Sequence, residues 1–203
     1  MPWIILDRDG VINYDSDDYI KSAEEWRALP GSIEAICALK KAGYNVAVAT
    51  NQSGLARGLF DLDDLEAMHS KLQRLLAEYD ANTVYAIDAI FYCPHLPEDD
   101  CACRKPKTGL LDALEKEFEV SLAGSWLVGD HVKDIELALA KQCKPALVLT
   151  GKGKTCAKLL AENPPLSNTP VFNDLLAFTT ELLTKDQLNT ETFTTAPLKG
   201  KIS

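Results

Sequence analysis

The sequence predicts an α/β fold, with a Rossmann-like parallel sheet that carries helices on both faces. Short apolar runs alternate with amphipathic helical patterns along most of the 203 residues, which is typical of a parallel sheet. Polar and acidic clusters follow several of the apolar runs directly, as in open sheets that bind ligands at the carboxyl ends of their strands. No repeat of a solenoid or propeller period is present.

The apolar runs predict six strands, and the segments between them predict helices. The strands are expected at residues 3–6, 45–49, 89–92, 125–128, 146–149 and 171–172, and the helices at residues 32–42, 62–79, 109–118, 132–141, 154–162 and 174–183. Gly31 and Gly43 bound the first helix, and Asp61 or Asp63 is suited to cap the second. Residues 163–165 predict a turn-rich connection before the last strand.

Length and composition predict one globular domain at residues 1–184, without a large cap domain. The chain is long enough to bury a core without disulfides or metals, and its 46% hydrophobic and 25% charged residues are ordinary for such a domain. From Lys185 onward the sequence is polar, threonine-rich and aperiodic. Residues 185–203 are therefore expected to form a mobile tail.

Charge and the N-terminal sequence exclude several classes of partner. The net charge of −9 disfavours nucleic acid and anionic membrane surfaces. No apolar run approaches the length of a membrane span, and no signal-peptide pattern begins the chain. We therefore expect a cytoplasmic protein, with a monomer as the default. An anionic substrate would need local positive charge or a metal ion.

Asp7 and Asp9 form the most informative pair of residues. They follow the strand predicted at residues 3–6, and alternate residues of an extended segment project to the same side. Two carboxylates so close need a cation, a shared proton or a division of labour. Gly10 suits a tight turn or a close backbone approach. Alone, the pair is better explained as two solvated aspartates at a strand end.

Three further polar clusters follow predicted strands. They are Thr50-Asn51-Gln52-Ser53, Arg104-Lys105 and Gly129-Asp130. Each has an ordinary explanation by itself, as a turn, a solvated lysine or a helix cap, but their shared position at strand ends favours one site.

The combined set suits phosphoryl transfer. A carboxylate can attack phosphorus to give an aspartyl phosphate, and a hard divalent cation, naturally Mg²⁺, would neutralise both. A second acid must protonate the leaving oxygen and later activate water. Thr50 and Lys105 would hold the phosphoryl oxygens on which charge develops.

A calcium-binding EF-hand loop does not fit the acidic segment at residues 7–18. Such a loop needs an oxygen ligand at its fifth position and glycine at its sixth. Counted from either Asp7 or Asp15, these positions hold aliphatic or aromatic residues.

The ordered motifs carry a family resemblance. The segments DRDGVIN, ATNQSGLARG, YCPH with a later CxCRKPK, and VGD resemble the bacterial D-glycero-D-manno-heptose 1,7-bisphosphate 7-phosphatases, a branch of the haloacid dehalogenase superfamily. The resemblance spans about residues 3–180, on the length expected of a single domain. It implies Mg²⁺-dependent removal of the 7-phosphate from a phosphorylated sugar, in the synthesis of nucleotide-activated heptose for surface polysaccharide.

The resemblance also implies a role for each matching residue. Asp7 would be the nucleophile and Asp9 the general acid and base, with Mg²⁺ on the Asp7 carboxylate, the Asp9 backbone carbonyl and the Asp130 carboxylate. Thr50 and Lys105 would stabilise the phosphoryl group. The residues implied to bind substrate are Asp15, Asp18, Tyr19, Asn51, Gln52, Ser53, Arg104 and His131.

Two features depart from the family pattern. The acidic loop before Tyr19 is one residue longer than in some members, and His131 stands where other members carry a lysine. Both affect substrate recognition rather than phosphoryl chemistry. A histidine can still donate to a phosphate or hydroxyl, although it is not a constant cation near neutral pH.

Four potential metal ligands crowd into residues 93–103, namely Cys93, His95, Cys101 and Cys103. Three thiolates and one imidazole fit a closed, tetrahedral and structural Zn²⁺ site, and free reduced thiols are the alternative. Because Arg104 and Lys105 follow directly, such a site would hold them in place. The remaining cysteines, Cys37, Cys143 and Cys156, are expected to be small buried hydrophobes. His69 is expected on the surface or in helix packing, away from these clusters.

Two other functions compete with the heptose phosphatase. Histidinol phosphatases share the zinc loop, and CPHLP in this sequence resembles their version, whereas the GLARG segment at residues 54–58 favours the heptose branch. A signalling receiver domain also uses an aspartyl phosphate with Thr, Lys and Mg²⁺. Receiver domains are shorter, carry the phosphate on a later strand and lack a partner acid placed like Asp9.

Overall fold

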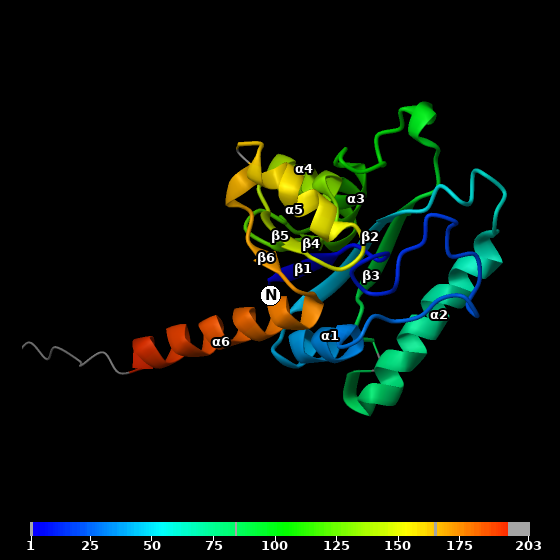
Figure 1. Ribbon diagram of the computed structural model, residues 1–203. Coiled ribbons are helices and arrows are strands. Elements are labelled where there is room, and N and C mark those ends of the chain that lie inside the picture. The colour runs from blue at the N-terminus through cyan, green and yellow to red at the C-terminus, as the bar shows by residue number, and fades with distance from the viewer. Residues whose placement is uncertain (1, 84, 165, 195–203) are drawn as a thin grey trace, which may run out of the picture.

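A six-stranded parallel sheet forms the centre of the computed structural model, which describes residues 2–83, 85–164 and 166–194, with side chains up to residue 188 (Figure 1). The strands are β1 (Trp3–Leu6), β2 (Asn45–Asn51), β3 (Ala89–Cys93), β4 (Trp126–Gly129), β5 (Lys144–Val148) and β6 (Val171–Phe172). Their order is β3-β2-β1-β4-β5-β6, and each neighbouring pair is parallel. The predicted α/β fold is confirmed.

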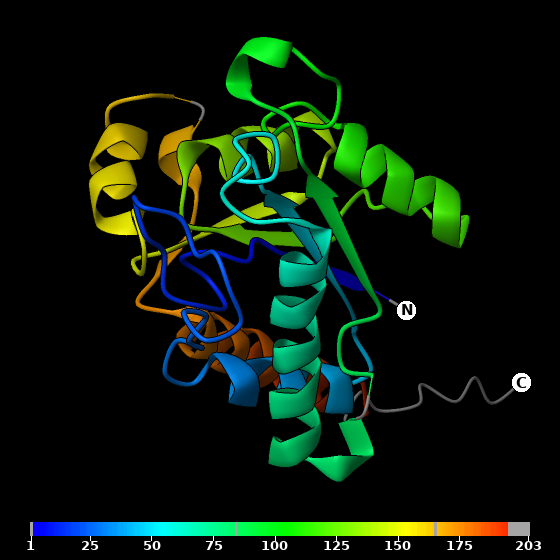
Figure 2. The ribbon, with the colours of Figure 1, turned by 90° about the vertical axis from the view of Figure 1, so that its right-hand side faces the viewer.

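Helices cover both faces of this sheet, as Figures 1 and 2 show from two directions. One face carries α1 (Ser32–Lys41), α2 (Leu62–Tyr79) and α6 (Leu175–Thr194), and the other carries α3 (Gly109–Phe118), α4 (Val132–Ala140) and α5 (Gly153–Ala161). Short 3-10 turns lie at Ala81–Thr83, Pro97–Asp99 and Leu166–Asn168.

The alternation of side chains along β1 divides the core into two layers. Ile4 and Leu6 are fully buried with residues of α1 and α2, whereas Trp3 and Ile5 pack with residues of α3. Burying one such aliphatic side chain stabilises the fold by roughly 1.5–3 kcal/mol. A strand buried on both faces in this way needs a continuous apolar sequence, which is why residues 3–6 contain no polar residue.

Asp61, the first of the two predicted capping residues, is the N-cap of helix α2. The Asp61 carboxylate accepts a hydrogen bond of 2.9 Å from the Asp64 N–H, and the Asp64 carboxylate accepts one of 3.1 Å from the Asp61 N–H. This reciprocal pair satisfies two amide groups that the helix leaves unbonded at its start.

Helix α6 is longer than predicted and occupies the first part of the expected tail. It continues to Thr194, and Figure 1 shows its far end reaching beyond the sheet. The Lys185 ammonium lies 2.6 Å from Glu181 one turn earlier, and Tyr44 donates a hydrogen bond to Asp186. These polar contacts accompany the later part of the helix, beyond the predicted residues 174–183, where the sequence has no apolar stripe. The rest of the predicted tail, residues 195–203, lies outside the described residues.

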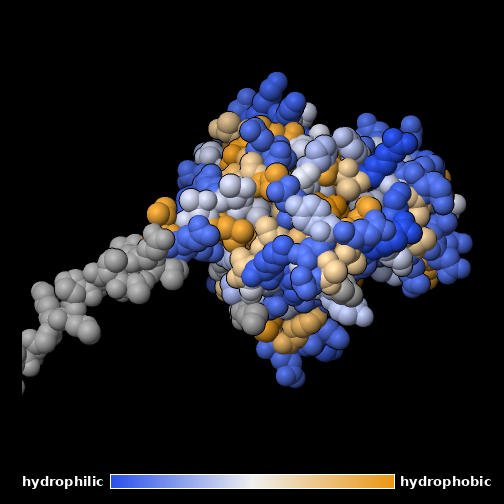
Figure 3. Space-filling model, turned by 90° about the horizontal axis from the view of Figure 1, so that it is seen from below, coloured by the Kyte–Doolittle hydropathy of each residue, from blue (hydrophilic) through white to orange (hydrophobic). Residues whose placement is uncertain are grey.

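Hydrophobic residues on the face shown in Figure 3 lie in small groups between hydrophilic ones. Within the described ranges, no helix combines the length and the apolar character needed to cross a membrane.

Candidate active site

A cavity of about 280 Å³ lies at the carboxyl edge of the sheet. Strand order reverses there between β1 and β4, which is where open α/β sheets bind ligands. The cavity brings together nearly all the predicted site residues: Asp7, Asp9, Asp15, Tyr19, Thr50, Asn51, Gln52, Ser53, Arg104, Lys105, Asp130 and His131. Asp18 does not line it, and its side chain is exposed.

Lys105 is the cation at the floor of this cavity. Its Nζ lies 2.8 Å from Asp7 Oδ2 and 2.7 Å from Asp134 Oδ1, and it donates a third bond of 2.9 Å to the Ala49 carbonyl. The side chain is only 4% exposed. Burial alone would favour the neutral amine, but Asp134 and Asp7 raise the pKa of Lys105 above its ordinary value, so the ammonium stays charged.

Asp7, Asp130 and Asp134 form a carboxylate cluster, whose closest oxygens all lie within 4.8 Å of one another. Burial raises the pKa of Asp7 to about 7, against the opposing effect of Lys105. Burial and the nearby charge of Asp7 raise the pKa of Asp130 to about 8. A divalent cation would relieve both the burial and the repulsion, and carboxylate oxygens are the ligands that Mg²⁺ prefers. The residues present therefore fit this ion.

Two glycines allow the backbone to pack directly against Asp130. A Cβ atom added to Gly10 would lie 2.1 Å from Asp130 Oδ2, and one added to Gly151 would lie 2.0 Å from the same oxygen. Both glycines have positive φ angles, 82° and 53°, which other residues rarely adopt. The Lys152 N–H donates to this oxygen at 2.8 Å. The loops after β1 and β5 thus fix the position of the Asp130 carboxylate.

Asp134 is a site residue that sequence reasoning missed. It is fully buried in the first turn of α4, and its carboxylate accepts a 3.1 Å hydrogen bond from the His131 N–H. Because Asp134 stands one helical turn after Asp130, the spacing D-x-x-x-D across a helix start places both carboxylates at the same end of the sheet. That spacing, together with the capping pattern from His131 to Asp134, was the available signal.

Asp9 is held by a network of donors rather than by the other carboxylates. Arg8 contacts both of its oxygens at 3.1 Å, Asn13 Nδ2 donates at 2.8 Å and Gln52 Nε2 donates at 2.7 Å. Burial would raise the pKa of Asp9, but Arg8 and the two amides lower it below its ordinary value. The carboxylate is therefore ionised in the free protein.

His69 lies behind this network, so the prediction that it stands away from the site is wrong. Its Nε2 is 3.5 Å from Arg8 Nη1, and burial beside that cation lowers the pKa of His69 to about 4. Arg8 itself is only 1% exposed. The guanidinium is enclosed between Asp9, Gln52 and a neutral imidazole, because His69 on α2 lies beside it.

The residues after β2 hold neighbouring groups in place. Asn51 bonds the main chain of Lys105 twice, accepting from its N–H at 3.1 Å and donating to its carbonyl at 3.3 Å. The side chain of Gln52 donates to Thr50 Oγ1 at 3.0 Å as well as to Asp9. Both side chains line the cavity as predicted, but the amide of Asn51 is used to position Lys105.

The other predicted substrate-binding residues differ in what their polar groups contact. Arg104 Nη1 donates to the His95 carbonyl at 3.2 Å. His131 caps α4, its Nδ1 accepting from an N–H at 3.2 Å, and burial lowers the pKa of its imidazole. Tyr19 adopts a positive φ of 64°, and a hydrogen bond with Ser53 is the main cause that lowers the pKa of its hydroxyl.

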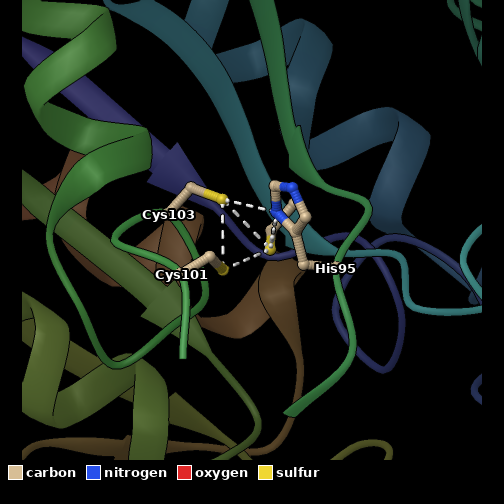
Figure 4. Close-up of side chains that lie close together, drawn as sticks. His95, Cys101 and Cys103 are labelled. Atoms are coloured by element: carbon tan, nitrogen blue, oxygen red, sulfur yellow. Dashed lines mark hydrogen bonds between the residues drawn. The ribbon is translucent and has the colours of Figure 1, made fainter. Parts of the chain in front are cut away.

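Cys93, His95, Cys101 and Cys103 converge as the sequence predicted, and we name them the cysteine–histidine cluster. Cys103 Sγ lies 3.2 Å from both Cys93 Sγ and His95 Nδ1, and 3.4 Å from Cys101 Sγ. Figure 4 shows His95, Cys101 and Cys103 pointing toward one another. Three sulfurs and one nitrogen at these separations fit a tetrahedral Zn²⁺ site.

Cys37, Cys143 and Cys156 are buried free thiols, as expected.

Comparisons with known proteins agree with this geometry. A family model described as HAD-hydrolase-like matches residues 102–178. A Pseudomonas aeruginosa protein named D-glycero-beta-D-manno-heptose-1,7-bisphosphate 7-phosphatase is 52% identical over 181 residues, which cover 89% of this chain and 97% of the relative. The chain belongs to this phosphatase family.

Solved structures support the same assignment to the heptose 1,7-bisphosphate 7-phosphatase family. The crystal structure of a D,D-heptose 1,7-bisphosphate phosphatase from Bordetella bronchiseptica, complexed with magnesium and phosphate, matches with a TM-score of 0.83 and 48% identity, covering 91% of this chain and 99% of that one. The corresponding structure from Burkholderia thailandensis matches with a TM-score of 0.67 and 38% identity, over 91% and 99% of the two chains. The resemblance noted in the sequence and the haloacid dehalogenase-like fold are both confirmed.

Proposed function

We propose that this protein removes the 7-phosphate from D-glycero-β-D-manno-heptose 1,7-bisphosphate. The observation that carries the proposal is the placement of Lys105 Nζ 2.8 Å from the Asp7 carboxylate, beside Asp130, in a chain that is 52% identical to a relative of that name. The names of that relative and of others specify the β anomer, which sequence motifs alone did not distinguish.

The carboxylates of Asp7 and Asp130 and the backbone carbonyl of Asp9 would hold Mg²⁺, with Asp134 beside them. When bound, the ion neutralises charge on the nucleophile and on the phosphate. A carboxylate oxygen of Asp7 attacks phosphorus, forming an aspartyl phosphate while the bond from phosphorus to the sugar oxygen breaks. Lys105 and the hydroxyl of Thr50 stabilise the charge that develops on the phosphoryl oxygens.

Asp9 moves the proton in both half-reactions. It donates a proton to the departing sugar oxygen, and then accepts one from the water that attacks the aspartyl phosphate. Arg8 and the amides of Asn13 and Gln52 favour the ionised carboxylate, which is the form that activates water. An anionic phosphate close by opposes them and favours the protonated form needed first.

We further propose that the cysteine–histidine cluster holds a structural Zn²⁺. A filled tetrahedral shell leaves no position for a reacting water, and Cys103 directly precedes the two cationic residues Arg104 and Lys105. The metal would therefore fix the loop that delivers them.

The remaining assignments are also proposals. Residues 1–184 would form the catalytic domain, with the end of α6 as an extension. We also propose a monomer, and a cytoplasmic location that is supported by thiolate ligands that must stay reduced.

A phosphate-release assay with Mg²⁺ tests the function. We expect much faster hydrolysis of the β-heptose 1,7-bisphosphate than of its α anomer or of histidinol phosphate, and no hydrolysis by the Asp7→Asn variant. Equal or faster release from histidinol phosphate would reject the heptose assignment. Release by Asp7→Asn at the wild-type rate would reject the aspartyl-phosphate mechanism.

A further inference from the structure

Lys152 stands at the rim of the active-site cavity and has no role in the mechanism above. It follows β5, immediately before α5, and faces the acidic loop that follows β1. Its Nζ lies 3.2 Å from Asp17 Oδ1 and 3.6 Å from Asp15 Oδ2, and all three residues line the cavity. These ion pairs join two sides of the cavity mouth.

The main chain of Lys152 is fixed to the catalytic floor. Its N–H donates to Asp130 Oδ2 at 2.8 Å, and the neighbouring Thr150 hydroxyl donates to the Gly10 carbonyl at 2.6 Å. The ammonium, in contrast, is at the end of a flexible stem, and the side chain is 50% exposed. Lys152 therefore reaches from beside the Asp130 carboxylate toward solvent, and its charged end is free to change partner.

A sugar with two phosphates needs positive charge at two places in this cavity. Lys105 serves the reacting phosphate, and Arg8 is buried against Asp9. His131 is used as the cap of α4, and burial disfavours its charged form. Of the lysines and arginines that line the cavity, Lys152 is the most exposed. In a chain with a net charge of −9, the second phosphate depends on such a local cation.

The present partners of Lys152 can be displaced. Asp17 is 93% exposed, and ion pairs in such surroundings contribute little because water screens them. A phosphate presents more negative charge and more acceptor oxygens than one carboxylate, so it makes the stronger charge-assisted hydrogen bonds with an ammonium.

We propose that Lys152 is a specificity-determining residue that binds the second phosphate of the bisphosphorylated sugar. To bind it, the ammonium of Lys152 breaks its ion pairs with Asp15 and Asp17. Asp17 then competes with the substrate for the same ammonium. This proposal rests on the proposed function, because it requires a substrate with two phosphates.

Steady-state kinetics on two sugars that differ only in the second phosphate test the proposal. The sugars are D-glycero-β-D-manno-heptose 1,7-bisphosphate and D-glycero-D-manno-heptose 7-phosphate, and the variants are Lys152→Gln and Asp17→Asn. Lys154→Gln is the matched control, because it removes an exposed lysine from the same helix start and does not line the cavity. Unfolding temperatures of all variants establish that each is folded.

We expect Lys152→Gln to raise KM for the bisphosphate by at least about tenfold, because the substrate loses a hydrogen bond to a charged group. The value of kcat should change little. The kinetics of the monophosphate and of Lys154→Gln stay at wild-type values. Asp17→Asn lowers KM for the bisphosphate by up to about threefold, because an exposed competing ion pair is removed. It has no such effect when combined with Lys152→Gln.

Equal changes for the two sugars, or no change for either, would overturn the role of Lys152. A raised KM in Asp17→Asn would overturn the competition. A wild-type enzyme that releases no phosphate from the bisphosphate would instead reject the proposed function, and the role of Lys152 with it.

Discussion

The carboxylate cluster and the cysteine–histidine cluster both suit a metal ion, but the chain builds them differently. All four residues of the cysteine–histidine cluster lie within residues 93–103, on one strand end and one loop. The carboxylate cluster joins Asp7, after β1, to Asp130 and Asp134, after β4, across the centre of the sheet. One is local in sequence, and the other exists only when β1 and β4 pair.

The two clusters also differ in burial, although each spans the range from buried to more exposed members. Asp130, Asp134 and Cys93 are 4%, 0% and 0% exposed, whereas Asp7, Cys101 and Cys103 are half-buried and His95 is exposed. A buried cluster of like charges raises the pKa of its members and lowers stability unless a cation or Lys105 neutralises it. An exposed loop with few core residues gains its order from the metal instead. We therefore propose that a metal at the carboxylate cluster would serve chemistry, and that a metal at the cysteine–histidine cluster would serve structure.

The largest expected effect comes from Asp9, which lies between the nucleophile and the network of donors. Asp9→Asn removes the proton carrier but keeps an oxygen that can accept from Asn13, so the fold is retained. We expect kcat to fall by about 10²- to 10⁴-fold, the usual contribution of general acid–base catalysis. Phosphate release and thermal unfolding measure the two properties.

Asp18→Asn is the matched control, because it changes an exposed aspartate of the following loop that does not line the cavity. Its kcat should stay within about twofold of wild type, as for a surface substitution. Turnover by Asp9→Asn at a similar level would show that Asp9 does not carry the proton.

A second, smaller effect tests whether Asp134 belongs to the functional cluster. In Asp134→Asn, an oxygen remains to accept from the His131 N–H, so the start of α4 is preserved. Lys105 loses one of its two charged partners and the carboxylate cluster loses one of its three carboxylates. We expect kcat to fall by about 10²-fold, similar to the removal of one electrostatic stabilising group. Magnesium titration of activity should show a weaker apparent affinity.

The control is Asp112→Asn on α3, which removes a carboxylate from a lysine at the surface. Asp112 lies 2.8 Å from Lys141 and is 52% exposed. Its kinetics should match wild type. If Asp134→Asn also matches wild type, Asp134 has only a capping role.

Asp134 also marks the limit of what the sequence could predict. Asp7, Thr50, Lys105 and Asp130 were predicted because each directly follows a short apolar run or completes a motif, and parallel strands bring their ends to one edge. Asp134 lies in the first turn of a helix, where an aspartate is common because it stabilises the helix N-terminus. Its presence there therefore did not indicate a role in the site.

Two other features that the sequence analysis did not predict correctly also depend on contacts between distant parts of the chain. The contact of His69 with Arg8 depends on how α2 packs beside the residues that follow β1, and the periodicity of neither segment predicts that packing. The end of α6 depends on a contact between Asp186 and Tyr44, residues far apart in the chain. Local patterns therefore predicted the elements and their order, whereas partners between elements required the structure.

Removal of one cysteine ligand tests whether the cysteine–histidine cluster stabilises the loop that carries Lys105. Cys101→Ser should lower the zinc content below about one ion per chain and lower Tm, because the loop loses a metal ligand. We expect kcat to fall only about tenfold, since Asn51 still holds the main chain of Lys105. Elemental analysis, thermal unfolding and phosphate release measure the three quantities.

Cys37→Ser provides the control, because its sulfur lies 3.4 Å from Thr83 Oγ1 and a serine can keep that polar contact. It should retain the zinc content of the wild type. A metal-free Cys101→Ser protein with unchanged Tm and unchanged kcat would show that the cluster does not position the catalytic lysine.

The smallest expected effect separates metal binding from ion pairing as the cause of order in this loop. Asp100 pairs with Lys107 across the loop, but its side chain is 90% exposed. It also adopts a positive φ of 45°, which asparagine tolerates as well as aspartate does. Asp100→Asn therefore removes the charge without straining the backbone, and exposed ion pairs stabilise little. Zinc content, Tm and kcat should all stay at wild-type values, because the cysteine–histidine cluster is intact. A fall in Tm comparable to that of Cys101→Ser would mean that the ion pair, and not the metal, orders the loop.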